Sequence, residues 1–300
     1  MVRPPPPPKG TPAADDGSPG YTRQVPADRI AENLAYINWT VLAGLAVGGF
    51  SAVALGRLRT SATRGYLAFT ALCAAIFAVL AYLSDTALPV GLADSTIRAD
   101  PTWDLPRRAA LIAVAVIGLA YAVAVARGRR ASVLALAGVA AGCAALAAGA
   151  IGWGGGLLRA APLAIQLVVL ALATGGVFAS MILGHWYLVT PKLSEAPLIL
   201  FSRLLLTIVG LQLLLFGVWV AGGTGGGGPF SALTGPWALF VWLRLIVGLL
   251  FPLAVSWAAV QTARSRSMES ATGLLYIDVG SIAAGTILAA GLYFGAGMLV

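Results

Sequence analysis

Residues 162–189 read PLAIQLVVLALATGGVFASMILGHWYLV, a run without a single Asp, Glu, Lys or Arg. About 20 apolar residues in a helix cross the roughly 30 Å hydrocarbon core of a bilayer. This run exceeds that length, so we expect a membrane-spanning helix that is tilted or extends into the interface. Seven further apolar runs resemble it, and together they fill nearly all of the chain after residue 33.

The apolar runs predict an all-α fold, a polytopic membrane helix bundle with eight transmembrane helices. Hydrophobic residues make up 59% of the chain and charged residues 10%, whereas soluble domains have about 45–50% and about 25%. The runs lie near residues 34–56, 66–84, 109–126, 132–151, 162–189, 198–221, 237–261 and 272–297. Pro252 lies inside the seventh run and lacks a backbone N–H, so we expect a kink whose freed carbonyl is satisfied by a neighbouring group. Residues 34–300 are predicted to form one membrane domain.

The first 33 residues differ in composition from the rest of the chain. They contain the polyproline run Pro4–Pro8, followed by Gly, Ser, Ala and Asp. Such a segment buries too little apolar area to offset the entropy lost on ordering. We therefore expect residues 1–33 to form a disordered or extended Pro-rich tail.

Basic residues in the short loops predict the orientation of the bundle. One set of loops contains Arg57, Arg59, Arg64, Arg127, Arg129, Arg130, Lys192, Arg264 and Arg266. The opposite set contains Arg98, Arg107, Arg108 and Arg159, together with Asp85, Asp94, Asp100 and Asp104. Because cytoplasmic loops are enriched in Lys and Arg, we expect the odd-numbered loops to be cytoplasmic and both the N- and C-termini to lie outside.

The formal net charge of +8 follows from these loop arginines. Because most of them lie at the ends of apolar runs, the excess indicates topology and contact with membrane lipids, not nucleic-acid binding. We expect an integral protein of a bacterial inner (cytoplasmic) membrane.

Four polar side chains are predicted to share one layer of the inner leaflet: His185, Arg203, Tyr276 and Asp278. At about 1.5 Å per residue, Arg203 and Asp278 lie about 9 Å into the sixth and eighth spans. An acid and a base at matching depth can neutralise each other, so these two residues are the predicted charge pair. Two interpretations stay open. The pair is a structural bridge that fixes helix packing, or the layer is a polar pocket for a protonatable ligand, with His185 or Asp278 exchanging the proton.

His185 is the only histidine of the chain. It precedes Trp186 and Tyr187, so a hydrated residue at the membrane interface is an alternative to a ligand-binding role. One histidine excludes bis-histidine haem within this chain, and no ligand cluster supports a zinc or iron site. We predict no metal ligands and no catalytic constellation. Cys73 and Cys143 lie in apolar runs without CxxC spacing and are interpreted as small core residues.

Other polar residues within the spans have simpler interpretations. Asn38, Gln166 and Gln212 are predicted to form hydrogen bonds between helices. Arg244 lies toward the outer side of the seventh span, where it pairs with the acidic 85–108 loop or meets an anionic ligand.

The last two spans resemble a known family. Arg264 is followed by Ala271-Thr272-Gly273-Leu274-Leu275-Tyr276 and by a small-residue helix with Gly285. This order resembles the end of the membrane anchor subunits of DMSO reductase and polysulfide reductase (NrfD-like subunits). The resemblance implies eight or so helices that bind a quinol and pass electrons to an attached iron–sulfur subunit. Thr286 and Ala290 stand where that family often has an acidic residue and an arginine, so no quinol-site residues are transferred from it.

The first functional hypothesis is a membrane subunit of a redox (electron-transfer) complex that binds quinone or quinol in the inner-leaflet polar pocket. His185, Tyr276 and Asp278 would supply the polar groups, and Arg203 would set the local electrostatics. The hypothesis expects other subunits as partners, because nothing in the chain holds an iron–sulfur cluster. It expects quinone as a cofactor and none bound covalently. The alternatives are an ion- or proton-coupled transporter, an accessory or scaffold subunit without chemistry of its own, and a lipid-modifying enzyme.

Overall fold

Eight helices long and apolar enough to cross a membrane form the bundle. The computed structural model describes residues 2, 25–89, 97, 99–157, 160–190 and 193–300. Within these ranges the chain forms helices and no β-strand. The predicted all-α fold with eight spans is therefore confirmed, and the chain is an integral membrane protein.

The helix bounds agree with the apolar runs to within a few residues. The helices are α1 (Pro26–Glu32), α2 (Leu34–Arg59), α3 (Arg64–Thr86), η1 (Pro101–Trp103), α4 (Asp104–Ala126), α5 (Ser132–Trp153), α6 (Ala160–Val189), α7 (Ala196–Gly222), η2 (Thr224–Gly226), η3 (Ser231–Leu233), α8 (Ala238–Leu245), the π-helical segment η4 (Ile246–Leu250), α9 (Phe251–Arg264) and α10 (Met268–Ala296). The seventh span consists of α8, η4 and α9 in succession.

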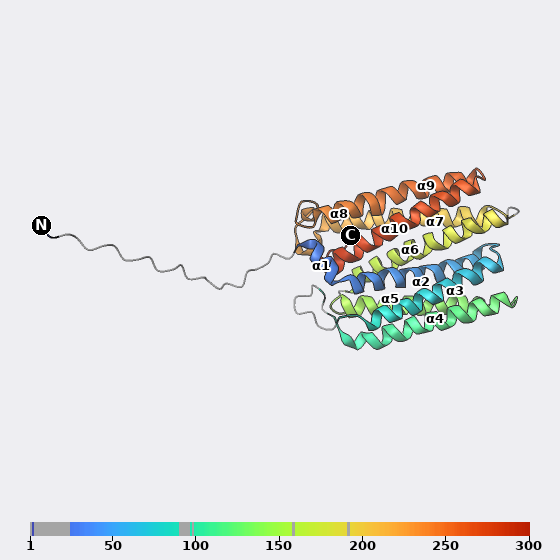
Figure 1. Ribbon diagram of the computed structural model, residues 1–300, viewed down its shortest axis with the longest axis horizontal. Coiled ribbons are helices and arrows are strands. Elements are labelled where there is room, and N and C mark those ends of the chain that lie inside the picture. The colour runs from blue at the N-terminus through green and yellow to red at the C-terminus, as the bar shows by residue number, and fades with distance from the viewer. Residues whose placement is uncertain (1, 3–24, 90–96, 98, 158–159, 191–192) are drawn as a thin grey trace.

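Two helices far apart in the sequence, α2 and α6, form the centre of the bundle. They pack along each other, with α3, α4 and α5 on one side and α7, α8, α9 and α10 on the other (Figure 1). Most of the α6 side chains within its span are buried inside the protein, whereas α7 and α9 are largely exposed on their outer faces. The long uncharged run at residues 162–189 thus forms one of the two central helices.

Glycines allow α2 and α6 to approach backbone to backbone. A Cβ atom built on Gly48 would lie 1.8 Å from the carbonyl oxygen of Ala171, and one on Gly175 would lie 2.1 Å from the backbone nitrogen of Gly49. No side chain fits at either position. Small residues are typical of such contacts in membranes, where packing rather than hydrophobicity holds helices together.

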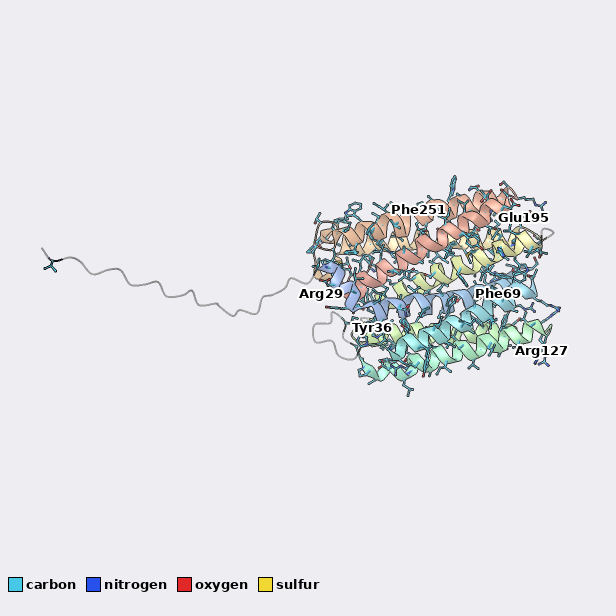
Figure 2. The ribbon with its side chains drawn as sticks, in the orientation of Figure 1. Arg29, Tyr36, Phe69, Arg127, Glu195 and Phe251 are labelled. Atoms are coloured by element: carbon cyan, nitrogen blue, oxygen red, sulfur yellow. The ribbon has the colours of Figure 1, made fainter. Side chains whose placement is uncertain are left out.

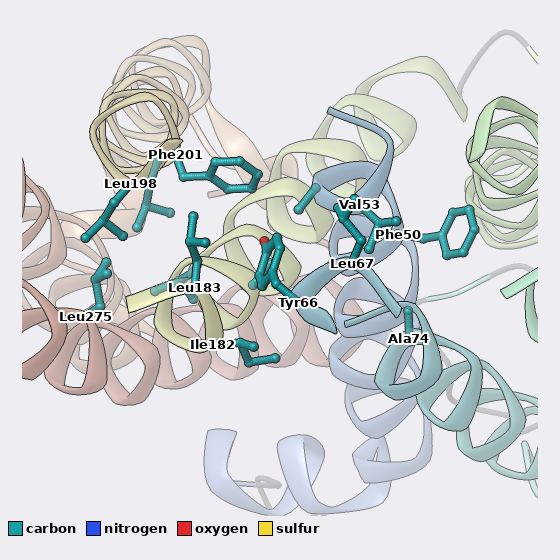
Figure 3. Close-up of a cluster of buried hydrophobic side chains, with 14 of the residues drawn as sticks. Phe50, Val53, Tyr66, Leu67, Ala74, Ile182, Leu183, Leu198, Phe201 and Leu275 are labelled. Atoms are coloured by element: carbon teal, nitrogen blue, oxygen red, sulfur yellow. The ribbon is translucent and has the colours of Figure 1, made fainter. Parts of the chain in front are cut away.

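The largest apolar core lies between α2, α3, α6, α7 and α10. Phe50, Tyr66, Leu183, Phe201 and Leu275 are among its buried members, and Figure 3 shows their side chains among the packed helices. A second core lies nearer to α1 and the C-terminus. It contains a cluster of aromatic rings among aliphatic side chains, and in this cluster Trp39 and Trp153 meet edge to face with ring centroids 4.7 Å apart.

The two ends of the bundle differ in what they contain. We call the end with α1 and the C-terminus the terminal end, and the end with the α2–α3, α4–α5, α6–α7 and α9–α10 connections the distal end (Figure 1). Figure 2 shows Arg29 and Tyr36 at the terminal end and Arg127 and Glu195 at the distal end. Helix α1 and the C-terminus therefore lie at the same end of the bundle (Figure 1). That the N- and C-termini lie outside the membrane stays a prediction.

One helix lies within the segment predicted to be disordered or extended. Pro26 begins α1, and Ile30 packs close to Gly291 of α10. The prediction for residues 1–33 is thus wrong for α1, where proline is favourable in the first turn of a helix and Ile30 packs against α10. The polyproline run and the loop residues Asp94, Arg98, Arg159 and Lys192 lie outside the described residues.

Candidate functional site

The four predicted site residues do not converge on one pocket. The side chains of His185 on α6 and Arg203 on α7 are exposed on the outer surface of the bundle, and Tyr276 on α10 is 50% exposed. Only Asp278 is fully buried. The predicted pocket of all four residues is therefore not assembled.

The predicted pair of Arg203 and Asp278 is wrong. No ion pair joins them among the described residues, and the carboxylate instead accepts hydrogen bonds from two serines. The Oγ atom of Ser256 on α9 lies 2.5 Å from Asp278 Oδ2, and that of Ser281 lies 3.3 Å from Oδ1. The matching depth of the two residues in their spans did not predict a contact, because depth does not fix the direction of a side chain around its helix axis. Ser202 and Leu205 face the bundle, so Arg203 points away from it.

A second buried charge, Arg244 of α8, has a role that the sequence interpretation missed. Its side chain is 2% exposed, and its Nη2 atom donates to Gln212 Oε1 on α7 at 2.7 Å. The Nη1 atom donates to the carbonyl oxygen of Gly248 at 3.1 Å. Arg244 therefore contacts neither the 85–108 loop nor the surface within the described chain. It binds neutral oxygens in the interior.

The contact with Gly248 is explained by Pro252. In an α-helix the carbonyl of Gly248 would accept from the N–H four residues later, and Pro252 has none. The chain forms the π-helical segment η4 immediately before α9, and the guanidinium of Arg244 supplies the missing donor. The prediction that a neighbouring group satisfies the freed carbonyl is thus confirmed. The signal was present in the sequence as an arginine eight residues before a proline in the same span.

The predicted amide contacts between helices are also confirmed. Gln212 Nε2 donates to the Val169 carbonyl on α6 at 2.9 Å, and Gln166 Nε2 donates to the Ala289 carbonyl on α10 at 3.4 Å. Asn38 Nδ2 donates to Ser84 Oγ on α3 at 3.2 Å. Each bond ties two spans together.

A cavity of about 350 Å³ lies between α2, α6 and α7. Its wall consists of leucine, isoleucine and alanine side chains together with Gly48, Gly176 and the ring of Phe201. Two hydroxyl groups, of Ser51 and Ser180, are the polar side-chain groups of this lining. Most of the lining lies in the distal half of the three helices. Predominantly apolar lining with a few polar groups is typical of small-molecule sites.

The two hydroxyl protons are already engaged. Ser51 Oγ donates to the Val47 carbonyl at 2.8 Å, and Ser180 Oγ donates to the Gly176 carbonyl at 2.7 Å. A serine hydroxyl has one proton and two lone pairs, so both oxygens retain the capacity to accept a hydrogen bond. The cavity therefore offers two weak acceptors in an apolar wall.

A larger, polar cavity of about 740 Å³ lies at the distal end, between the α6–α7 and α9–α10 connections. Arg266 and Glu195 form an ion pair on its wall, with Nη2 and Oε2 2.8 Å apart. The hydrogen bond from Arg266 holds the pKa of the Glu195 carboxyl below its ordinary value. Both side chains are partly exposed, so the pair links two loops and does not form an enclosed site.

The terminal end has an ionic network that connects α3, α4 and α5. Asp85 accepts hydrogen bonds from Arg107 and from Arg108 Nε, the latter at 2.7 Å. The Arg107 guanidinium also lies 4.5 Å from the ring centroid of Trp153. The mixed charge of the loop around residues 85–108 was the signal for this network, which fixes the helix ends.

Comparisons with protein-family models, curated proteins and solved structures find no match to this chain. Among the described residues no three His, Cys, Asp or Glu side chains gather as metal ligands would. The class that the fold defines is an eight-span integral membrane protein, and its candidate functional features are the apolar cavity and the buried side chains of Arg244 and Asp278, neither of which has a charged partner among the described residues.

Proposed function

We propose that the protein is the membrane subunit of a redox complex and binds a quinone or quinol in the cavity between α2, α6 and α7. The single observation behind the proposal is that cavity, whose volume of about 350 Å³ falls within the range of small-molecule sites, roughly 300–1,000 Å³. A quinone needs an apolar slot for its ring and tail and a few polar atoms for its oxygens. The leucine-rich wall provides the slot. The oxygens of Ser51 and Ser180, whose protons are held by backbone carbonyls, can accept hydrogen bonds from the two hydroxyl groups of a quinol.

The proposed site differs from the one first expected. It lies in the half of the bundle predicted to be the inner leaflet, but it is lined by the opposite face of α7 from Arg203. His185 and Tyr276, which are exposed, fit contact with lipid headgroups or with another subunit. The resemblance of the last two spans to quinol-binding anchors supports the same class of function. Because the chain has only two cysteines, an iron–sulfur partner would have to supply its own cluster ligands.

The test is a pair of glycine variants. A Cβ atom on Gly176 meets nothing within 4 Å and the residue lines the cavity, so Gly176→Phe fills the cavity without a backbone clash. Gly217 on α7 has equally open surroundings but faces outward, so Gly217→Phe is the matched control.

The protein is purified in mild detergent and its organic extract is measured by mass spectrometry. We expect near-stoichiometric quinone with the wild type and with Gly217→Phe, and at least about tenfold less with Gly176→Phe, since a bulky side chain in a filled site removes more than about 1.4 kcal/mol of binding free energy. Equal quinone in all three proteins, or none above the lipid background in any, would contradict the proposal. The second outcome would favour a scaffold or transporter role.

A further inference from the structure

Asp278 lies in the bundle interior with partners of an unusual kind for a carboxylate. The residue is fully buried on α10, and its two carboxylate oxygens accept from Ser256 on α9 and Ser281 one turn further along α10. Ser281 Oγ also donates to the Asp278 carbonyl at 3.1 Å. Buried charges in proteins are usually paired with an opposite charge or a metal. Here both partners are neutral hydroxyls.

The charged and titratable side chains on the elements packed against α10 do not reach this carboxylate. Arg244 on α8 lies beside Gly285, about 10 Å along α10 from Asp278 at 1.5 Å per residue, and it is bound to Gln212 and Gly248. Tyr187 on α6 donates to the Ser194 carbonyl. The remaining ones on α1, α2, α6 and α9 are Asp28, Arg29, Glu32, Tyr36, Arg57, Arg59, His185 and Arg264. These lie near the helix ends or on exposed faces, and no ion pair of Asp278 occurs in the described ranges.

The chemistry of the partners decides what the site can do. An arginine can only donate, so it would hold an aspartate in its charged form. A serine hydroxyl can donate to a carboxylate, and it can equally accept from a carboxylic acid. In the second state Ser256 can direct its own proton to the backbone carbonyl four residues earlier, a common bond of helical serines. Both protonation states of Asp278 are therefore fully hydrogen-bonded without movement of the helices.

We propose that Asp278 is a proton-exchange site inside the membrane bundle, with Ser256 and Ser281 as positioning residues that accept either protonation state. The ligand of the site is a proton, taken up from and released to water. This inference does not rest on quinone binding in the cavity. It gives a proton-coupled function to the half of the bundle formed by α6–α10, which also contains the buried Thr174–Thr286 and Arg244–Gln212 contacts.

Dicyclohexylcarbodiimide tests the proposal directly, because it partitions into apolar regions and reacts only with protonated carboxyl groups. The acid adds its proton to one carbodiimide nitrogen and its oxygen to the central carbon, and the adduct rearranges to a stable N-acylurea. The full chain in mild detergent is treated between about pH 5 and pH 9, and the labelled residue is identified by peptide mass spectrometry. Asp85 is the internal control, because it is equally buried but held by Arg107 and Arg108.

We expect an adduct on Asp278 whose rate of formation falls about tenfold per pH unit above its midpoint, as for a single titrating group. Asp85 should stay unlabelled. Asp278→Asn should remove the adduct, and Ser256→Ala should change the pH of half-maximal labelling while the fold is retained. No adduct on Asp278 at any pH, a rate independent of pH, or equal labelling of Asp85 would overturn the proposal. Protection by Na⁺ at constant pH would also overturn it, in favour of a metal-cation site. Bound quinone, measured separately, is expected to be the same in all these variants.

Discussion

The contact between α2 and α6 makes a sharp prediction about two adjacent glycines. Gly175 faces α2, and a Cβ atom there would lie 2.1 Å from the backbone nitrogen of Gly49 and 2.4 Å from the carbonyl carbon of Gly48. Gly176 is the next residue of the same helix, yet a Cβ atom there meets no atom within 4 Å. Alanine at these two positions adds the same methyl group to opposite environments.

The expected difference follows from the distances. To bring the closest contact of Gly175→Ala from 2.1 Å to the 3.4 Å of an ordinary contact, α2 and α6 must separate by about 1.3 Å. Both partners are backbone, so no side chain can rotate away. Overpacking of this kind costs about 1–3 kcal/mol, and the separation also weakens the surrounding dispersion contacts. We expect Gly175→Ala to lower the unfolding free energy by about 3 kcal/mol, near the top of that range. Gly176→Ala should change it by less than about 1 kcal/mol, the scale of the difference in helix propensity.

The assay is equilibrium unfolding in mixed micelles of mild detergent and SDS, followed by the fluorescence of the eight tryptophans. Far-ultraviolet circular dichroism checks that both variants start from the same helix content. If the transition of Gly175→Ala coincides with that of Gly176→Ala, the two central helices are not in backbone contact and the packing described for α2 and α6 is incorrect.

Two further predictions concern Arg244 and Glu195. Arg244→Met should lower the unfolding free energy by about 2–4 kcal/mol, because it leaves the Gln212 and Gly248 oxygens unpaired. In the Pro252→Ala background residue 252 supplies an N–H to the Gly248 carbonyl, so the cost of Arg244→Met should be smaller by about 1 kcal/mol or more. Strict additivity of the two substitutions in a double-mutant cycle would refute the role given to Arg244. Arg266 lowers the pKa of Glu195 from 4.5, so the stability from this pair is complete above that pH and is lost as the pH falls through the lowered pKa. The melting temperature of Glu195→Gln should therefore be lower than that of the wild type at neutral pH, and the two melting temperatures should converge below pH 4.5. A difference in melting temperature that is constant with pH would contradict the pairing.

The sequence predicted the spans well because span length is set by the membrane. Residues 162–189 had to cross it, and the charges of Arg59 and Arg64 marked where two helices end and begin. Pro252 predicted a disturbed helix for a similar reason, since a missing N–H has the same consequence in any surroundings. These inferences needed no knowledge of neighbouring helices.

Which face of each helix is buried in the bundle could not be predicted in the same way. In a soluble protein a polar stripe marks the outer face of a helix, but a lipid-facing surface is as apolar as the core. Tyr276 and Asp278 are two residues apart and lie on different faces of α10, one exposed and one buried. Gly175 and Gly176 are chemically identical, and only the structure shows that one touches a backbone and the other a cavity.

The two buried charges of the α6–α10 half illustrate what decides whether such a group is structural. Arg244 is bound to oxygens that need a donor, one of them created by Pro252, so the arginine completes the backbone of its own span. Asp278 is bound to hydroxyls that would be satisfied without it, since helical serines can donate to their own backbone. The oxygens around Arg244 would lose their hydrogen-bond donor without it, whereas the hydroxyls around Asp278 would still have an acceptor without the carboxyl group. A buried carboxyl that the fold does not need is the one for which a function in proton exchange has to be sought.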